Sequence, residues 1–159
     1  ASQALTLEQV MAHPVVQRIL APVDKIIEQP VRWQEQGLWC KGKPDVVVVD
    51  DVVDLKTAAD PRPEVWLGEA ARWGFGRQAA LYLNGCTAAY GRPYRNFIFP
   101  VVGKKPPHLV YVYVARDPSE SLKLSREQNA KDLLDLAERI RSGDWGLPEI
   151  HPFEIPAWR

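Results

Sequence analysis

The sequence is poor in cysteine and methionine, and it lacks long apolar runs. It contains two cysteines and one methionine in 159 residues. Two thiols, Cys40 and Cys86, are too few for a disulfide framework or for an iron–sulfur cluster with four cysteine ligands. No apolar segment reaches the roughly 20 residues that span a bilayer, and we expect no secretory leader. We therefore expect a cytoplasmic protein with reduced thiols and no membrane partner.

Net charge is also missing, because 20 Lys and Arg residues balance 20 Asp and Glu residues. A protein that binds nucleic acid over its whole surface usually carries a positive excess. The balance argues against tight non-specific binding of that kind and leaves room for a local basic groove. With 46% hydrophobic and 25% charged residues, the composition predicts one compact domain over residues 1–159.

The most informative stretch is the valine-rich segment 46–55. Two short apolar runs, 46–49 and 52–55, flank the pair Asp50-Asp51, which predicts two strands joined by a tight turn. Asp54 lies on the second strand, and Lys56, two residues later, projects from the same face. Closing the turn at Asp50-Asp51 would bring Asp45, at the start of the first strand, back toward Lys56.

Two carboxylates and an ammonium gathered at one point indicate a specific chemistry. Charged groups beside apolar strands are costly unless they pair or bind an ion. Mg²⁺ typically takes one or two carboxylates together with substrate phosphate. A neighbouring lysine can orient water or stabilise charge that develops on phosphorus. An Asp-x-Lys tripeptide alone would more simply be a surface ion pair, but the full spacing Pro-Asp-x8-Asp-x-Lys is far more specific.

Three motifs in this order and spacing resemble the PD-(D/E)XK nuclease superfamily, within it the RecE-like (exonuclease VIII type) and RecB-like branch. They are CKGKPD at residues 40–45, DLKTA at 54–58 and QAALY at 78–82, and the ending IPAW at 155–158 is also similar. The resemblance extends from about His13 to the C-terminus. It implies an α/β fold with a PD-(D/E)XK restriction-endonuclease-like core, in which helices flank a mixed sheet.

The resemblance also implies roles for individual residues. Asp45 and Asp54 would bind Mg²⁺ or Mn²⁺, with the Leu55 backbone carbonyl as a further ligand. Lys56 would assist hydrolysis of a phosphodiester bond. Glu28, in the strand that precedes the Pro-Asp motif, matches a position that binds metal or positions water; the alternative is an exposed strand glutamate.

Gln78 and Tyr82 lie four residues apart and so share one helical face. In the resembling nucleases this pair lies beside the metal and contacts DNA or the network that positions the nucleophile. In an arbitrary helix the same pair would carry no information. His13, at the end of a helix and next to Pro14, is expected to be structural.

The pattern along the chain predicts helices and strands in a definite order. We expect a helix over 5–20 that is interrupted at Pro14, and a long helix weakened at Gly74 and Gly76. An antiparallel meander should lie between them, and Pro100 should divide the region that follows. The expected strands are 26–33, 38–41, the pair described above, 94–102 and 108–115; the helices over 64–91 and from Ser119 or Ser121 to 142 follow, and a tail over 144–159 should pack on the sheet.

The resulting hypothesis is a Mg²⁺-dependent exonuclease that acts on double-stranded DNA ends, from the 5′ side, in phage-type recombination or repair. The family implies a single-strand annealing protein as partner and a homo-oligomer. One alternative is a non-catalytic DNA-end-binding or assembly module, and another is a sequence-specific endonuclease. RecE-like nucleases also carry an upstream helical region with a Gly-x-x-x-His signature, which His13 does not match. We therefore expect a fragment or a shortened version in which a metal ligand is missing.

Overall fold

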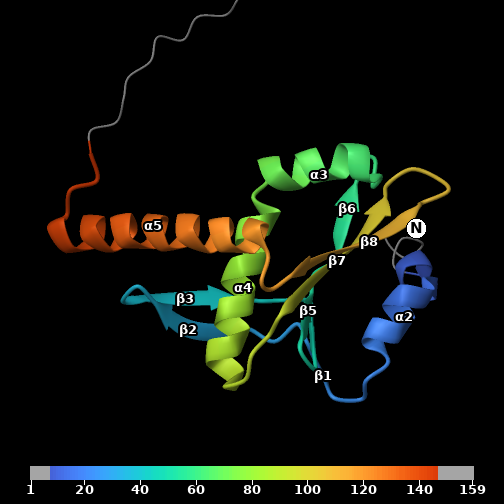
Figure 1. The fold of residues 1–159 in the computed structure, drawn as a ribbon, viewed down its shortest axis with the longest axis horizontal. Coiled ribbons are helices and arrows are strands. Elements are labelled where there is room, and N and C mark those ends of the chain that lie inside the picture. The colour runs from blue at the N-terminus through green and yellow to red at the C-terminus, as the bar shows by residue number, and fades with distance from the viewer. Residues whose placement is uncertain (1–7, 147–159) are drawn as a thin grey trace, which may run out of the picture.

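The computed structural model describes residues 8–146 (Figure 1). Residues 8–12 form a helical segment ahead of α2, and twelve further elements follow. These are α2 (Pro14–Leu20), β1 (Lys25–Ile27), β2 (Val31–Glu35), β3 (Leu38–Gly42), β4 (Val46–Val48), β5 (Asp51–Val53), β6 (Lys56–Ala58), α3 (Pro63–Arg72), α4 (Phe75–Tyr90), β7 (Asn96–Gly103), β8 (Val110–Arg116) and α5 (Glu120–Ser142).

A mixed sheet forms the centre of the molecule. Its strand order is β1-β4-β5-β7-β6, and β8 pairs with β7. The pairs β1–β4, β4–β5 and β7–β8 are antiparallel, whereas β5 and β6 both run parallel to β7. The α/β class with a mixed sheet and flanking helices is confirmed.

Strands β5 and β6 are two halves of one extended segment that runs alongside β7. The register is continuous, since Val53 pairs with Ile98 and Lys56 pairs with Val101. In the gap, the Asp54 N–H still donates to the Ile98 carbonyl at 3.0 Å. The next donor on β7 would be Pro100, which has no N–H, so the ladder is interrupted at this point. The prediction that Pro100 divides the region was wrong, because β7 runs through it.

The two faces of this segment are covered by different helices. Val52 and Ala58 belong to the main core together with Ala79 and Leu83 of α4. Leu55 instead packs in a smaller cluster with residues of the N-terminal helices, and Figure 1 shows α2 and α4 on different sides of the sheet. Because side chains alternate along a strand, Asp54 and Lys56 project on the α4 side.

Strands β2 and β3 form a separate two-stranded hairpin packed on α4. The predicted strand 26–33 was wrong, because the chain turns between β1 and β2, where Glu28 has a φ of 48°. The hairpin and helix approach closely: a Cβ on Gly85 would lie 2.8 Å from the Trp33 ring, and one on Gly42 would lie 2.8 Å from the Tyr82 ring. Both glycines are therefore needed for this docking. The predicted single meander is replaced by a sheet and a hairpin.

The helix ends follow the sequence closely. His13 caps α2, since its Nδ1 accepts the Val15 N–H at 3.3 Å, which agrees with a structural histidine. The helical region after β6 breaks at Gly74, with a φ of 70°, as the glycines predicted. Ser119 caps α5 by accepting the Leu122 N–H at 3.3 Å. The predicted packing of the tail falls mostly on residues 147–159, which lie outside the described residues.

The structure also bears on possible membrane-spanning helices and on the state of the two cysteines among residues 8–146. No helix in this range is long and apolar enough to cross a bilayer. Both cysteines are free, and burial raises the pKa of the Cys86 thiol to about 11. The Cys86 thiol is therefore protonated at neutral pH and acts as a small core residue.

Candidate active site

The β4–β5 register brings the two predicted metal ligands together. Val46 pairs with Val53, so the positions just beyond the ladder, Asp45 and Asp54, face each other across the hairpin. The turn lies at Val49-Asp50 rather than Asp50-Asp51, because Val48 pairs with Asp51. Asp45 therefore faces Asp54, not Lys56 as predicted.

Asp45 is fixed by the interruption between β5 and β6. Its Oδ2 accepts the Leu55 backbone N–H at 2.7 Å. In an extended chain the N–H and C=O of one residue point toward the same neighbouring strand, so the Leu55 carbonyl is directed to the side where Asp45 lies. The β4–β5 ladder ends at the Val46–Val53 pair, so the Leu55 backbone groups lie just beyond it, at the place where the two carboxylates meet.

Asp54 is the buried member of the pair, with an exposed fraction of 6%. Burial raises the pKa of its carboxyl, and the nearby charge of Asp45 acts in the same direction, while the hydrogen bond and charge of Lys56 oppose the rise. Lys56 forms an ion pair with Asp54. Two carboxylates face each other here, and only Asp54 is paired with the ammonium; such a donor set suits a divalent cation with oxygen ligands.

Lys56 lies above an aromatic cluster that the sequence analysis did not single out. Its Nζ is 4.6 Å from the centre of the Phe75 ring, a cation–π distance. Phe75 is in turn 6.1 Å from both Trp66 and Phe99, measured between ring centroids. The Phe75 ring and the partial burial of Lys56, whose side chain is 18% exposed, limit the positions that the ammonium can take. Phe75 lies three positions before Gln78, and nothing in that local pattern indicates its contact with Lys56.

Gln78 and Tyr82 follow Phe75 along α4, toward the point where the β2–β3 hairpin packs on the helix. Phe75, one turn before Gln78, contacts Lys56. Tyr82, one turn after it, packs against Gly42 at the end of β3 and against Phe97 at 6.2 Å between centroids. Tyr82 therefore has a packing role in docking the hairpin. A role for either residue in contacting DNA stays a prediction.

Glu28 is placed differently from the expectation. It lies in the turn after β1, its side chain is 65% exposed, and its Oε2 accepts from Lys43 Nζ at 2.8 Å. That hydrogen bond lowers the pKa of the Glu28 carboxyl. The Glu28 backbone N–H donates to the Asp45 carbonyl at 2.8 Å, so the residue borders the site. Its predicted role in binding metal or water remains a prediction.

The donor set that the described residues offer a metal is therefore small. No group of three or more His, Cys, Asp or Glu side chains that could hold a metal occurs within residues 8–146. Asp45, Asp54 and the Leu55 carbonyl would hold Mg²⁺ or Mn²⁺, which commonly complete their coordination with water and substrate phosphate. The buried, paired carboxylate at Asp54 fits such an ion.

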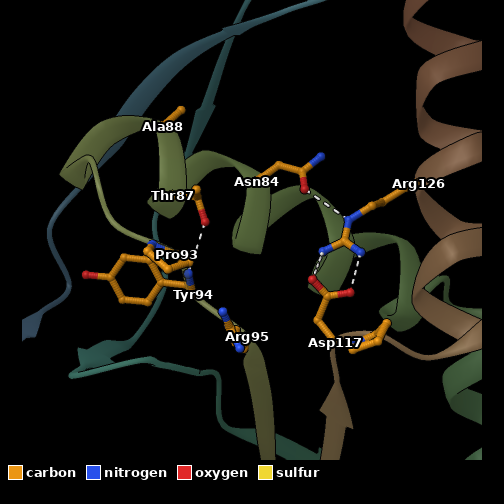
Figure 2. A pocket seen from close by; sticks show the side chains of 9 residues that line it. Asn84, Thr87, Ala88, Pro93, Tyr94, Arg95, Asp117 and Arg126 are labelled. Atoms are coloured by element: carbon orange, nitrogen blue, oxygen red, sulfur yellow. Dashed lines mark hydrogen bonds and ion pairs between the residues drawn. The ribbon is translucent and has the colours of Figure 1, made fainter.

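A cleft of about 700 Å³ lies elsewhere, between α4 and the loops before β7 and α5 (Figure 2). Arg126 dominates it, but its guanidinium is already used: it donates to Asn84 at 3.1 Å and to both Asp117 oxygens at 2.7 and 3.0 Å. Asn84 also donates to Glu35 at 3.0 Å. The cleft therefore contains a structural network that fastens α5 and the hairpin to α4.

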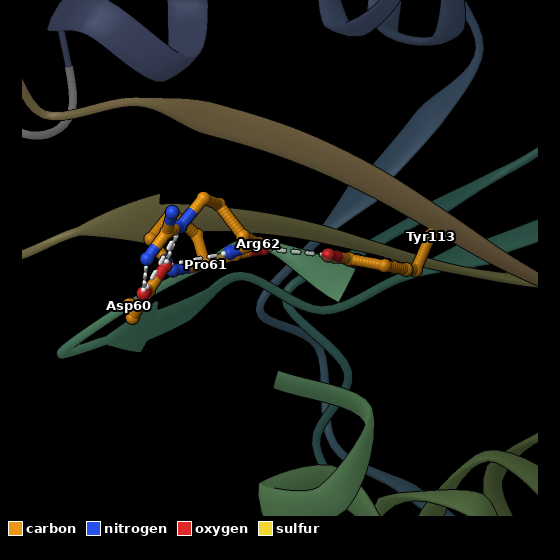
Figure 3. Close-up of polar contacts among 4 residues, drawn as sticks. All are labelled: Asp60, Pro61, Arg62 and Tyr113. Carbon is orange, nitrogen blue, oxygen red and sulfur yellow. Dashed lines mark hydrogen bonds and ion pairs between the residues drawn. The ribbon is translucent and has the colours of Figure 1, made fainter. Parts of the chain in front are cut away.

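A second polar cluster fixes the loop between β6 and α3 (Figure 3). Arg62 donates to both oxygens of Asp60, and Tyr113 donates to the Pro61 carbonyl at 2.5 Å. The hydrogen bonds from Arg62 lower the pKa of Asp60 to about 2. Asp60 is therefore paired with Arg62, and we do not count it among the carboxylates of the candidate site.

In this sheet one Asp directly precedes β4, and an Asp-x-Lys sequence begins directly after β5. This arrangement is typical of PD-(D/E)XK nuclease folds. The chain belongs to the family described as "PDDEXK-like domain of unknown function (DUF3799)", whose model matches residues 5–144. No curated protein has a significantly similar sequence.

One solved structure has the same fold. The chain is similar to one described as a "Putative exonuclease" from Eubacterium rectale, with a TM-score of 0.72 and 13% identity over 91% of this chain. The chain spans 55% of that protein's length. A second structure, described as SSO0001, has a TM-score of 0.46 and 14% identity, covering 89% of this chain and 66% of its own. At these identities the likeness concerns the fold alone, and the second carries no argument.

Proposed function

We propose that this chain is a metal-dependent DNA exonuclease, using Mg²⁺ or Mn²⁺ and acting at double-stranded ends from the 5′ side. The observation that carries the proposal is the pairing of Asp45 with the buried Asp54, next to Lys56, at a break in the sheet. A fold of the PD-(D/E)XK class supports it. The setting would be phage-type recombination or repair with a single-strand annealing protein and a homo-oligomeric assembly.

Each side chain has a role in this reaction. A bound divalent cation would supply charge stabilisation on the non-bridging and leaving oxygens of the phosphodiester. Asp45 and Asp54 would hold the cation, and the N–H of Leu55 keeps Asp45 in place. Lys56 has donors beyond the one directed at Asp54, and these would orient the attacking water in line with the leaving oxygen.

The non-catalytic DNA-end-binding module remains a second candidate because of one observation. Glu28, which the resemblance assigns to metal or water, is engaged by Lys43 on the surface. A site with two carboxylates binds a cation more weakly than one with three. Such a protein would retain the fold and bind ends without hydrolysing them.

The experiment is cleavage of a linear duplex labelled separately at its 5′ and 3′ ends, in Mg²⁺, in Mn²⁺ and in EDTA. Release of mononucleotides from 5′ ends only in the presence of metal is the expected result. Internal cuts would identify an endonuclease. Binding of ends without cleavage and without metal binding in calorimetry would establish the non-catalytic module instead. Metal binding without cleavage would mean a folded but incomplete site.

A further inference from the structure

The β2–β3 hairpin has a second face, directed away from α4. The register pairs Arg32 with Lys41 and Gln34 with Trp39. All four side chains are exposed, and Trp39 has an exposed fraction of 73%. We name these four residues the outward hairpin face; it consists of two cations, one amide and one indole.

No carboxylate lies on the outward hairpin face. The only acidic residue of the hairpin, Glu35, belongs to the inward face, where its two oxygens accept from Trp33 Nε1 at 2.9 Å and Asn84 at 3.0 Å. Within residues 8–146 neither Arg32 nor Lys41 takes part in an ion pair. The face is thus locally positive on a chain with zero net charge.

The outward hairpin face is energetically unfavourable when no ligand covers it. Like charges directly opposite each other on a strand pair are destabilising, and Arg32 and Lys41 occupy such positions. The Trp39 indole presents a large apolar surface to water. One kind of ligand relieves both: a chain that carries anionic groups beside flat aromatic rings, which describes a strand of nucleic acid.

The outward hairpin face is joined directly to the candidate active site. Lys41 precedes Asp45 by four residues, which span at most about 14 Å of extended chain. At the other root of the hairpin, the Glu28 N–H is bonded to the Asp45 carbonyl at 2.8 Å. A strand with one phosphate at Asp45 and Asp54 therefore has its neighbouring nucleotides within reach of the hairpin.

We infer that the outward hairpin face binds single-stranded DNA next to the cleavage site, with an unpaired base stacked on Trp39 and phosphates on Arg32 and Lys41. Gln34, opposite Trp39, supplies an amide for the edge of the stacked base. A duplex offers phosphates but no free base face, so Trp39 selects the unpaired strand. This inference deepens the proposed function and rests on it, since it names an unpaired strand at a double-stranded end as the part of the DNA that lies next to the site.

The test measures fluorescence anisotropy of a labelled single strand and of a labelled duplex in EDTA, where no cleavage occurs. Trp39→Ala is expected to weaken single-strand binding about tenfold, the effect of losing one base stack, and to change duplex binding little. The matched control is Trp73→Ala, which removes another exposed indole, 68% exposed and stacked by Arg72, and should leave both affinities unchanged.

Arg32→Glu gives a second readout that misfolding would not imitate. The new carboxylate faces Lys41, so the melting temperature should stay equal or rise. Single-strand binding should weaken, and the slope of log affinity against log salt should fall by about 0.7 for each phosphate that the variant no longer neutralises. A variant with higher stability and lower affinity separates binding from folding.

The outcomes are distinct from those of the cleavage assay. Wild-type affinity in Trp39→Ala, or an equal loss in Trp73→Ala, overturns the inference even where the wild-type chain cleaves DNA. A change in solution mass with unchanged affinity would make the face an interface between copies and also overturn it. A wild-type chain that does not cleave, but whose single-strand binding depends on Trp39, supports strand binding by the outward hairpin face and overturns the proposed nuclease activity.

Discussion

The central sheet and the β2–β3 hairpin carry their charged residues in opposite ways. In the sheet, Asp54 and Lys56 are largely buried and paired with each other. On the hairpin, Arg32 and Lys41 are exposed and face each other with the same sign. Both arrangements cost stability, the first through desolvation and the second through repulsion.

The difference indicates the size of the ligand that each region is built for. The buried Asp54, the facing Asp45 and one ammonium suit a small ion whose other ligands are water and one phosphate. An open face of cations and an indole suits an extended polymer that lies across it. The two regions are connected through Asp45 and Gly42, so one DNA strand can engage both, and the following variants separate them.

The largest expected effect is on cleavage, in Lys56→Ala. Loss of a fixed donor beside the reacting phosphate typically costs about 10²–10³-fold in rate, and the variant should fall by at least that much. It also leaves Asp54 without its ion pair, so the rate must be measured on the folded fraction, checked by circular dichroism. Lys131→Ala, on the exposed side of α5, is the control, and equal rates in the two variants would remove Lys56 from the mechanism.

Gly85→Ala should release the hairpin from α4. The added methyl group would lie 2.8 Å from carbon atoms of the buried Trp33 ring, and overpacking of this kind costs about 1–3 kcal/mol. Denaturant unfolding measures the loss. Gly68→Ala is the matched control, because Gly68 lies inside α3 with no atom within 4 Å of an added Cβ. It should stabilise by about 0.5–1 kcal/mol, and a stable Gly85→Ala would show that the hairpin docks loosely.

The sequence predicted that Asp45, Asp54 and Lys56 lie close together, and it predicted the strands around them less well; their role in binding metal and in catalysis stays a prediction. Asp45, Asp54 and Lys56 were identified because two carboxylates and a lysine at that spacing, within a valine-rich segment, are typical of a metal-dependent nuclease. The turn was misplaced by one residue, since Asp50 and Asp51 both favour turns and their residue types do not distinguish the two registers. Glu28 was assigned to a strand because a run of alternating residues does not reveal a residue with positive φ.

The interruption opposite Pro100 could not be predicted from local patterns. It arises because β7, more than 40 residues later in the chain, lies beside Asp54 with a proline in register. Phe75 was missed for a similar reason, since only the packing of α4 on the sheet brings its ring under Lys56. Long-range pairing of this kind fixes the geometry of the site, whereas residue types alone indicate its chemistry.

Asp45→Asn should raise the stability of the metal-free protein and lower its affinity for metal. Without metal it relieves repulsion with Asp54, and a stability gain of up to about 1 kcal/mol, or roughly 3 °C in melting temperature, is expected. With metal it should bind Mg²⁺ or Mn²⁺ more weakly, as measured by calorimetry. Asp50→Asn, in the exposed turn, should show neither effect. An unchanged metal titration in Asp45→Asn would exclude Asp45 as a ligand.

The smallest effect is the pH dependence of stability without metal, which arises from Asp54. Burial and the charge of Asp45 raise the pKa of Asp54 in the folded state above its ordinary value of 3.8. Its contribution to stability is therefore fully present below about pH 3.8 and is lost as the pH rises through the raised value. Asp54→Asn cannot titrate, so the stability of wild type relative to this variant should fall as pH increases. Saturating Mg²⁺ should reverse that trend in the wild type, because only the ionised carboxylate binds metal. Urea unfolding of both proteins from pH 4 upward, with and without Mg²⁺, measures these slopes; identical slopes in all conditions would mean that Asp54 is neither desolvated nor a metal ligand.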